Sequence, residues 1–271
     1  MAIKLKSIAT IGALIGALAL AGCGQEEKNP NHIKVGVIVG AEQQVAEIAQ
    51  KVAKDKYGLD VELVTFNDYV LPNEALSKGD IDLNAFQHKP YLDQQIKDRG
   101  YKLVSVGNSF VYPIAGYSKK IKSLNELQEG AQIALPNDPT NLGRSLLLLQ
   151  KVGLIKLKDN VGLLPTVLDV TENLKNIKLV ELEAPQLPRS LDDAQIALAV
   201  INTTYASQIN LTPTKDGLFV EEKDSPYVNL LVSREDNKDA ENVKKFVQAY
   251  QSDEVNDAAN KIFNGGAVKG W

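Results

Sequence analysis

The sequence has 271 residues, 44% of them hydrophobic, and a formal net charge of −4. This length and composition can bury the cores of two lobes of ordinary size. No basic patch or stripe is present, so a nucleic-acid partner is not expected. Two histidines and one cysteine are too few for a cluster of metal ligands, and no nucleotide-binding glycine motif is present, so neither a metal nor a cofactor is expected.

The N-terminus has the pattern of an export signal. Two lysines precede a run of apolar and small residues over 8–22, which is too short to cross a bilayer comfortably. The run ends in Leu20-Ala21-Gly22-Cys23, which resembles the lipobox of bacterial lipoproteins. We therefore expect residues 1–22 to be removed, a lipid on Cys23 to anchor the protein to the cell membrane facing the periplasm, and residues 23–31 to form a tether. The alternative is a buried helix that contains a cysteine.

Strand and helix patterns alternate through residues 33–117. The β-branched run 33–39 is typical of a buried parallel strand. Residues 42–57 have apolar side chains at helical spacing, and Gly58 ends this helix. Further strands are expected at 61–66, 81–86, 101–106 and 110–117, and further helices at 73–78 and 90–99.

A second series of strands and helices follows. Ser123 and Glu126 have the spacing of a capping box and predict a short helix over 123–128. The strand 132–135 leads into Asn137-Asp138-Pro139, which opens a leucine-rich helix that runs to Val152. Later strands are expected at 177–182, 196–201 and 227–233, and helices at 239–250 and 253–263.

These alternating elements predict an α/β fold with mainly parallel sheets. Because there are two such series, we expect two lobes with a ligand cleft between them, and chain crossings near Tyr112-Pro113 and near Asn202-Thr203. The predicted boundaries are residues 32–112 and 203–271 for lobe I and residues 113–202 for lobe II.

The turn at residues 136–144 is a candidate carboxylate site. A strand ends there and a helix begins, and helix N-termini attract anions. Asn141 and Arg144 lie three residues apart on one helix face, and a guanidinium matches a carboxylate with two hydrogen bonds. A cation near a helix N-terminus is unfavourable for the helix, which favours a functional role for Arg144. The alternative is an arginine at the surface paired with a nearby acid.

The stretch 84–91 is a second candidate, because it lies where a strand ends and a helix begins. Phe86, His88 and Tyr91, with Tyr69 from the preceding unit, are expected to form an aromatic box that suits a thioether. Ordinary core aromatics are the alternative. His88 is also considered as a general base, but no nucleophile or orienting partner can be assigned to it.

Methionine is absent from the chain after the signal, because the only methionine is Met1. A chain of this length usually contains several, so the absence is either chance or an adaptation to synthesis when sulfur amino acids are scarce.

The whole chain after the signal resembles the methionine-binding lipoproteins of ABC importers, the NlpA family. The stretches that carry the resemblance are Asn67-Asp68-Tyr69, Gly79 to His88, Pro136 to Arg144, Ala199 to Asn202 and Asn264 to Ala267. The resemblance implies a type II periplasmic-binding-protein fold that holds methionine between its lobes. It also implies delivery to an inner-membrane ABC permease with a cytoplasmic ATPase.

The same resemblance assigns roles to eight residues. It places Arg144 and Asn141 at the ligand carboxylate, and Asn202 and Asn229 as polar ligands near the backbone groups. It surrounds the ligand side chain with an aromatic set consisting of Tyr69, Phe86, His88 and Tyr91.

The leading expectation is therefore a lipid-anchored binding protein, and not an enzyme, that captures L-methionine and also D-methionine in the periplasm. The first alternative is a binding protein for another small amino acid or for a methionine-containing dipeptide. The second is a lipid-anchored enzyme that uses His88 as a base.

Overall fold

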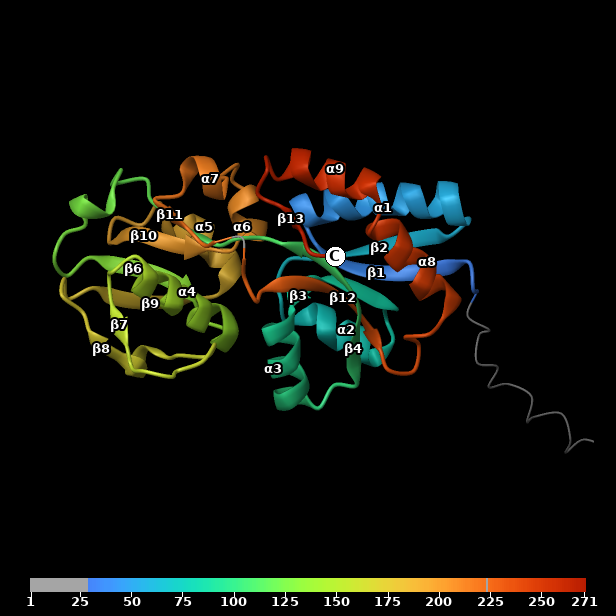
Figure 1. The fold of residues 1–271 in the computed structure, drawn as a ribbon, viewed down its shortest axis with the longest axis horizontal. Coiled ribbons are helices and arrows are strands. Elements are labelled where there is room, and N and C mark those ends of the chain that lie inside the picture. The colour runs from blue at the N-terminus through green and yellow to red at the C-terminus, as the bar shows by residue number, and fades with distance from the viewer. Residues whose placement is uncertain (1–28, 223) are drawn as a thin grey trace, which may run out of the picture.

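The computed structural model describes residues 29–222 and 224–271, which form two separate β-sheets that lie side by side in Figure 1. The first sheet has the strand order β13-β4-β12-β3-β1-β2. In it β1 is parallel to β2 and β3, whereas β12 is antiparallel to β3 and β4. Its strands are β1 (His32–Ile38), β2 (Asp60–Phe66), β3 (Leu83–His88), β4 (Leu103–Val111), β12 (Val228–Arg234) and β13 (Val268–Lys269).

The second sheet has the strand order β11-β5-β10-β6-β9, and β7 pairs with β8 outside it. Here β10, β6 and β9 are parallel, whereas β5 is antiparallel to β10 and β11. The strands are β5 (Ala115–Tyr117), β6 (Gln132–Pro136), β7 (Lys156–Leu157), β8 (Val170–Glu172), β9 (Lys178–Leu182), β10 (Ile196–Ile201) and β11 (Phe219–Val220). We call the part of the molecule built on the six-stranded sheet lobe I and the part built on the five-stranded sheet lobe II.

Helices pack on both sheets (Figure 1). Those of lobe I are α1 (Ala41–Tyr57), α2 (Leu71–Lys78), α3 (Lys89–Arg99), α8 (Glu241–Tyr250) and α9 (Asp253–Ile262). The helices that follow β6, β9 and β10 are α4 (Pro139–Lys151), α5 (Leu187–Ser190), α6 (Thr203–Ser207) and α7 (Pro213–Asp216). Short 3₁₀ turns lie at Leu124–Glu126, Val167–Asp169 and Ala184–Gln186. The two-lobed α/β fold expected from the sequence is confirmed.

The cores follow from the apolar spacing along the elements. In α1 the buried side chains Val45, Ala49 and Val52 share one face, and the helix ends at Gly58, whose left-handed backbone (φ 61°) suits glycine. These side chains pack against β1 and against α8 and α9 in one hydrophobic cluster. A second cluster, with leucines of α4 at its centre, fills lobe II. Each lobe therefore buries a core of its own, which leaves the surface between them to form a site.

Two details of the predicted layout are wrong. The expected strand 110–117 is two strands, because residues 112–114 leave the sheet of lobe I at the end of β4 and enter the sheet of lobe II as β5. The expected assignment of 203–271 to lobe I fails at β11, which pairs with β5 in lobe II. A two-residue strand has no pattern by which a sequence could reveal its partner.

Within the described residues the chain crosses between the two sheets at two places. The first, at residues 112–114, is a predicted one. The crossing predicted near Asn202-Thr203 is wrong, because β10 before it and β11 after it both belong to the sheet of lobe II. The second crossing lies between β11 and β12, at residues 221–227, and was not predicted. Two crossings make a natural hinge between lobes, as in other proteins that close around ligands.

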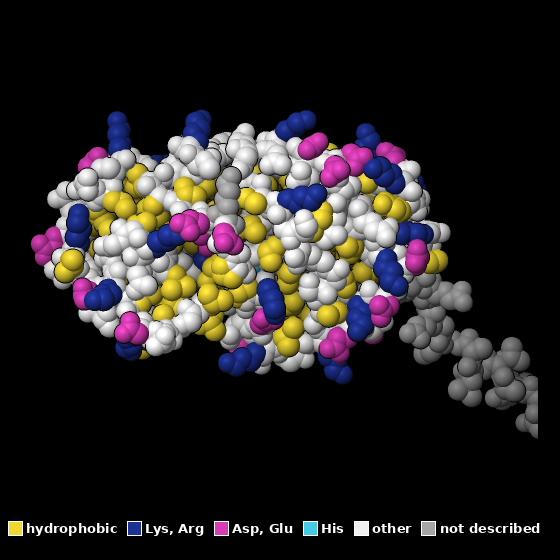
Figure 2. Space-filling view, in the orientation of Figure 1, with side chains coloured by type: hydrophobic (Ala, Val, Ile, Leu, Met, Phe, Trp, Pro, Cys, Tyr) yellow, Lys and Arg dark blue, Asp and Glu magenta, His cyan; other side chains and the backbone are white. Residues whose placement is uncertain are grey.

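Charges of both signs are mixed on the face of the molecule that Figure 2 shows, where Lys and Arg side chains lie among Asp and Glu. Within residues 29–222 and 224–271, no helix has the length and apolar character needed to span a membrane. The expected signal and Cys23 lie outside these residues.

Candidate functional site

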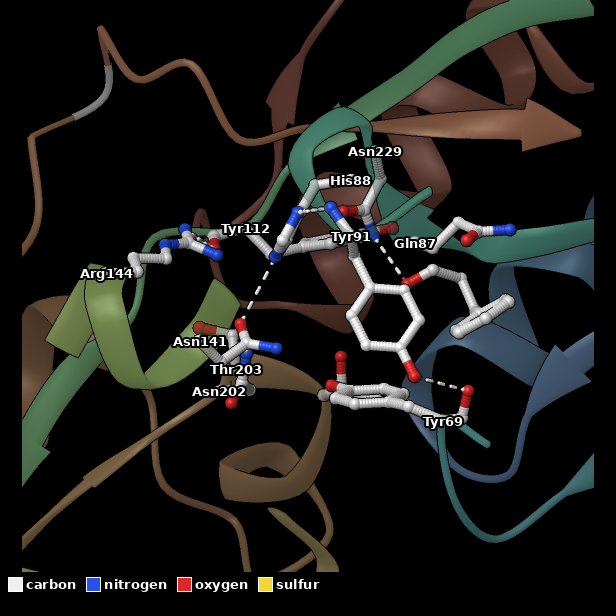
Figure 3. Close-up of a pocket in the computed structure, with 12 residues that line it drawn as sticks. Tyr69, Gln87, His88, Tyr91, Tyr112, Asn141, Arg144, Asn202, Thr203 and Asn229 are labelled. Carbon is white, nitrogen blue, oxygen red and sulfur yellow. Dashed lines mark hydrogen bonds between the residues drawn. The ribbon is translucent and has the colours of Figure 1, made fainter. Parts of the chain in front are cut away.

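A pocket lies between the lobes and encloses about 340 Å³ of non-atom space, part of it open to solvent. All eight residues expected at the site line it: Tyr69, Phe86, His88, Tyr91, Asn141, Arg144, Asn202 and Asn229. Four further residues complete the lining: Gln87, Tyr112, Thr203 and Thr204. The pocket is shown in Figure 3.

One end of the pocket is aromatic and belongs to lobe I. Phe86 lies near the end of β3, Tyr91 lies in the first turn of α3, and Tyr69 lies between β2 and α2. The ring centroids of Tyr69 and Phe86 are 5.8 Å apart, and those of Phe86 and Tyr91 are 6.0 Å apart. The hydroxyl of Tyr91 donates to the carbonyl oxygen of Tyr69 at 2.8 Å, so these two rings are held together (Figure 3). The arrangement presents apolar ring surface to the pocket.

His88 joins the two lobes across the pocket. It is the N-cap of α3, where Nδ1 accepts a hydrogen bond from the backbone N–H of Tyr91 at 3.1 Å. The proton therefore belongs on Nε2, which donates to Oδ1 of Asn141 in lobe II at 3.2 Å. Burial, together with the nearby charge of Arg144, lowers the pKa of His88 to about 3, so the ring is neutral at neutral pH. With both nitrogens engaged, the geometry gives no support to His88 as a general base.

Both polar atoms of the Asn141 side chain form hydrogen bonds. It lies in the first turn of α4, and its Nδ2 donates to both carboxylate oxygens of Asp138, the N-cap of that helix, at 3.1 and 2.9 Å. Its Oδ1 accepts from His88 and, at 2.8 Å, from Nδ2 of Asn202. Asn141 thus fixes the positions of its neighbours around the pocket.

Arg144 lies at the opposite end of the pocket from the aromatic rings, and its side chain is almost fully buried. Its Nε donates to Oε1 of Glu221 at 2.9 Å, and Nη2 donates to Oε2 of Glu221 and, at 3.0 Å, to the carbonyl oxygen of Tyr112. The guanidinium also lies 4.3 Å from the ring centre of Tyr227. Arg144 is therefore not at the surface, but it is paired with an acid, as the alternative expected, and this acid lies 77 residues away in the sequence.

Two amide side chains line the middle of the pocket. Asn229 at the start of β12 donates from Nδ2 to the carbonyl oxygen of Phe86 at 3.1 Å. Asn202 precedes α6 and donates to Asn141, but its buried Oδ1 has no hydrogen-bond partner in the described part of the chain. An unsatisfied buried acceptor is costly unless a ligand donates to it. The Asn202 oxygen is therefore a candidate acceptor for a bound ammonium group.

A buried carboxyl group behind the pocket was not predicted. Glu42 in the first turn of α1 is buried, and its Oε1 accepts from the hydroxyl of Thr204 at 2.6 Å. Its Oε2 has no partner among the described residues. Burial raises the pKa of Glu42 to about 8, so this group is protonated at neutral pH. A glutamate in an amphipathic helix gives no signal of burial, since most lie at the surface.

A buried amide network supports the lobe I wall of the pocket. Nδ2 of Asn73 donates to Gln87 at 2.7 Å, and Gln87 donates to Asn73 and Asn84 at 2.6 and 3.0 Å. The sequence analysis missed Asn73, whereas Asn84 and Gln87 lie in the candidate stretch 84–91 without an assigned role. No group of three or more His, Cys, Asp or Glu side chains that could hold a metal occurs in residues 29–222 and 224–271.

Comparison with known proteins gives consistent similarities. The family described as NlpA lipoprotein matches residues 33–271. The D-methionine-binding lipoprotein MetQ of Escherichia coli K12 is 87% identical over 271 residues, which is 100% of both chains. A nutrient-binding protein from Burkholderia cenocepacia bound to methionine is 52% identical, with a TM-score of 0.85, and the match covers 88% of this chain and 100% of that one. An ABC transporter periplasmic substrate-binding protein from Coxiella burnetii is 49% identical, with a TM-score of 0.84 and coverage of 88% and 99%.

Proposed function

Because the chain belongs to the NlpA lipoprotein family, we propose that it captures methionine in the periplasm and delivers it to an ABC importer. One observation carries the proposal. The pocket has buried aromatic rings at one end and a buried arginine at the other, with an unsatisfied amide oxygen between them. Methionine has a matching sequence of groups, with a thioether at one end and a carboxylate at the other.

The ligand is oriented by these three features. The thioether lies among Tyr69, Phe86 and Tyr91, because sulfur packs well against ring edges. The carboxylate faces Arg144, and the ammonium donates to Oδ1 of Asn202. In this pose Asn141 acts through its neighbours, because its own amide is fully engaged.

The alternative functions, an enzyme and a peptide-binding protein, fit the pocket less well. The pocket offers no catalytic base, since both nitrogens of His88 are engaged and its pKa is low. A larger peptide ligand would have to pass the buried Arg144–Glu221 pair at one end or the Tyr69–Tyr91 contact at the other.

Calorimetry on protein stripped of ligand by unfolding and refolding tests the proposal. L-methionine is expected to bind with a stoichiometry of one, and D-methionine to bind at the same site in competition with it. Mass spectrometry of the protein as isolated is expected to find methionine bound. Failure of both enantiomers to bind, with another amino acid copurifying instead, would overturn the assignment.

Membrane attachment and the transport partner complete the proposal. A lipid on Cys23, followed by the tether, would hold the binding protein beside an inner-membrane permease driven by a cytoplasmic ATPase. Cys23→Ala is expected to leave unlipidated precursor that the lipoprotein peptidase does not cut, with methionine binding unchanged because the site lies within the two lobes. Cell fractionation and mass spectrometry of the N-terminus measure this, and normally lipidated protein would exclude the lipobox.

A further inference from the structure

The Arg144–Glu221 pair forms a wall of the pocket. Arg144 lines the inner pocket, and both residues line a separate cavity on the outer side, together with Lys151 and residues 224–227. The exposed fractions of the two side chains are 3% for Arg144 and 14% for Glu221. Glu221 belongs to the second crossing between the lobes, where its backbone N–H donates to the carbonyl oxygen of Ile114 at 2.9 Å. Its carboxylate is therefore fixed at the hinge and not free to leave Arg144.

Glu221 occupies the side of the guanidinium that carboxylates prefer. Its two oxygens accept from Nε and Nη2 of Arg144, which is the bidentate arrangement. The carbonyl of Tyr112 takes another bond from Nη2, so a bound carboxylate approaches Nη1. Arg144 thus offers a ligand only some of its guanidinium N–H donors. Its positive charge is already balanced by Glu221.

The rest of the pocket lining carries no formal charge at neutral pH. Its one histidine, His88, is neutral because its pKa is lowered to about 3, and Glu42 behind Thr204 is protonated because its pKa is raised to about 8. Asp138 lies outside the pocket lining, at the N-terminus of α4, where the Asn141 amide donates to it and the helix dipole favours its charge. The lining residues together with Glu221 therefore carry no net charge.

We propose that Glu221 makes the site selective for a zwitterion over an anion, so that an α-amino acid with a free ammonium group is bound and its anionic analogues are rejected. A zwitterion adds no net charge to a neutral buried site, whereas an anion leaves one uncompensated negative charge there, which is costly. Without Glu221 the same pocket would carry the charge of Arg144 and favour the anion. The inference rests on methionine being the ligand.

The test compares two ligands in three proteins. The ligands are L-methionine and 4-(methylthio)butanoate, which is methionine without its amino group. The proteins are the wild type, Glu221→Gln and the control Glu222→Gln, which removes the same charge from the adjacent residue, where the carboxylate is exposed and paired with Lys151. Titration calorimetry gives the Kd of each ligand, and the ratio of the two Kd values cancels effects that both ligands share.

In Glu221→Gln the preference for methionine over 4-(methylthio)butanoate is expected to fall by about tenfold or more, whereas Glu222→Gln is expected to change it less than about twofold. An unchanged preference in Glu221→Gln, with both ligands weakened alike, would reduce Glu221 to a structural role and overturn the inference. An equal change in both variants would assign the effect to overall charge and also overturn it.

Two measurements keep the test decisive. If Glu221→Gln does not fold, Glu221→Asp keeps the charge but withdraws it from Arg144, and its preference is expected to fall in the same direction by a smaller factor. The wild type separates the two proposals: no methionine binding at all would refute the proposed function, whereas methionine binding with an unmoved preference in the variants would refute only the role of Glu221.

Discussion

The two ends of the pocket are built on different physical principles. The lobe I end consists of rings that lie close together in the chain, with Phe86, His88 and Tyr91 within one strand-to-helix turn. The other end joins Arg144 to Tyr112 and to the segment that holds Glu221 and Tyr227, so it brings together three distant parts of the chain. At the first end, the free energy of binding comes from apolar contact area. At the second end it comes from pairing of buried charges, where removing one partner leaves the other charge buried and unpaired.

This difference predicts how each end responds to change. Contact area is lost in proportion to the atoms removed, so substitutions at the aromatic end should alter the choice of side chain. Charge pairs are coupled, so substitutions at the arginine end should alter affinity and stability together. The variants below separate these behaviours.

Arg144→Ala is expected to have the largest effect. It removes the partner of the ligand carboxylate and leaves Glu221 unpaired in a poorly exposed place. Truncating one partner of a buried charge pair costs about 2–5 kcal/mol, which raises the Kd of methionine about 30-fold or more. The free energy of unfolding should fall by about 3 kcal/mol. Calorimetry and urea unfolding measure the two effects.

The control for this variant lies on the same helix. Lys151 is half-exposed and pairs with Glu222, so Lys151→Ala should change neither the affinity nor the stability by more than about 0.5 kcal/mol. Wild-type affinity in Arg144→Ala would remove the arginine from the site.

Phe86→Ala tests the aromatic end. Loss of a buried ring costs about 2 kcal/mol or more in contacts, so methionine should bind roughly 30-fold more weakly. Alanine and glycine, which do not reach the rings, should lose much less. Phe246→Ala is the matched control, because Phe246 is buried in the lobe I core away from the pocket. It should lower stability without changing selectivity, and equal weakening of all ligands by Phe86→Ala would disprove the box.

Asn202→Ala tests the middle of the pocket. The variant loses the bond to Asn141 and the acceptor offered to the ammonium. The acceptor is worth about 1 kcal/mol, so affinity should fall about fivefold. Because methionine contacts both lobes, it should favour the closed form, and the variant should close less. Small-angle scattering with and without methionine measures this. Identical wild-type profiles in the two conditions would argue against closure as the transport signal.

Two buried titratable groups predict opposite pH dependences of stability. The pKa of Glu42 is raised to about 8 in the fold, so the folded protein binds more protons than the unfolded chain and the Glu42 contribution is lost as pH rises from about 4.5 to 8. The pKa of His88 is lowered to about 3, so its contribution grows as pH rises from about 3 to 6.5. Above pH 6.5, Glu42 is the only one of these two groups that makes the stability depend on pH.

Glu42→Gln isolates this effect, the smallest of the series. Wild-type stability should decrease between pH 6.5 and 8 by up to about 1.4 kcal/mol per pH unit, and the variant should decrease less. Urea unfolding at several pH values measures the slope. Parallel wild-type and variant curves would show that Glu42 is not held protonated in the fold.

The sequence by itself determined what depends on neighbours along the chain. The alternation of buried strands and amphipathic helices predicted the two α/β lobes, and α1 lies at Ala41–Tyr57 where residues 42–57 were predicted. The stretch from Phe86 to Tyr91 predicted the aromatic end, since a strand end followed by a helix start brings these side chains together without help from the rest of the fold. All eight predicted site residues line one pocket, although their contact with methionine stays a prediction.

Only the tertiary structure decided which distant groups meet. Periodicity reports burial and backbone conformation, but it carries no information about which of many acidic residues will face a buried arginine. Glu221 reaches Arg144 because β11 pairs with β5 and returns the chain to the hinge, a step that two residues of strand could not signal. The orphaned oxygen of Asn202 and the protonated Glu42 arise in the same way, since hydrogen-bond satisfaction and desolvation depend on the surroundings that the folded chain supplies.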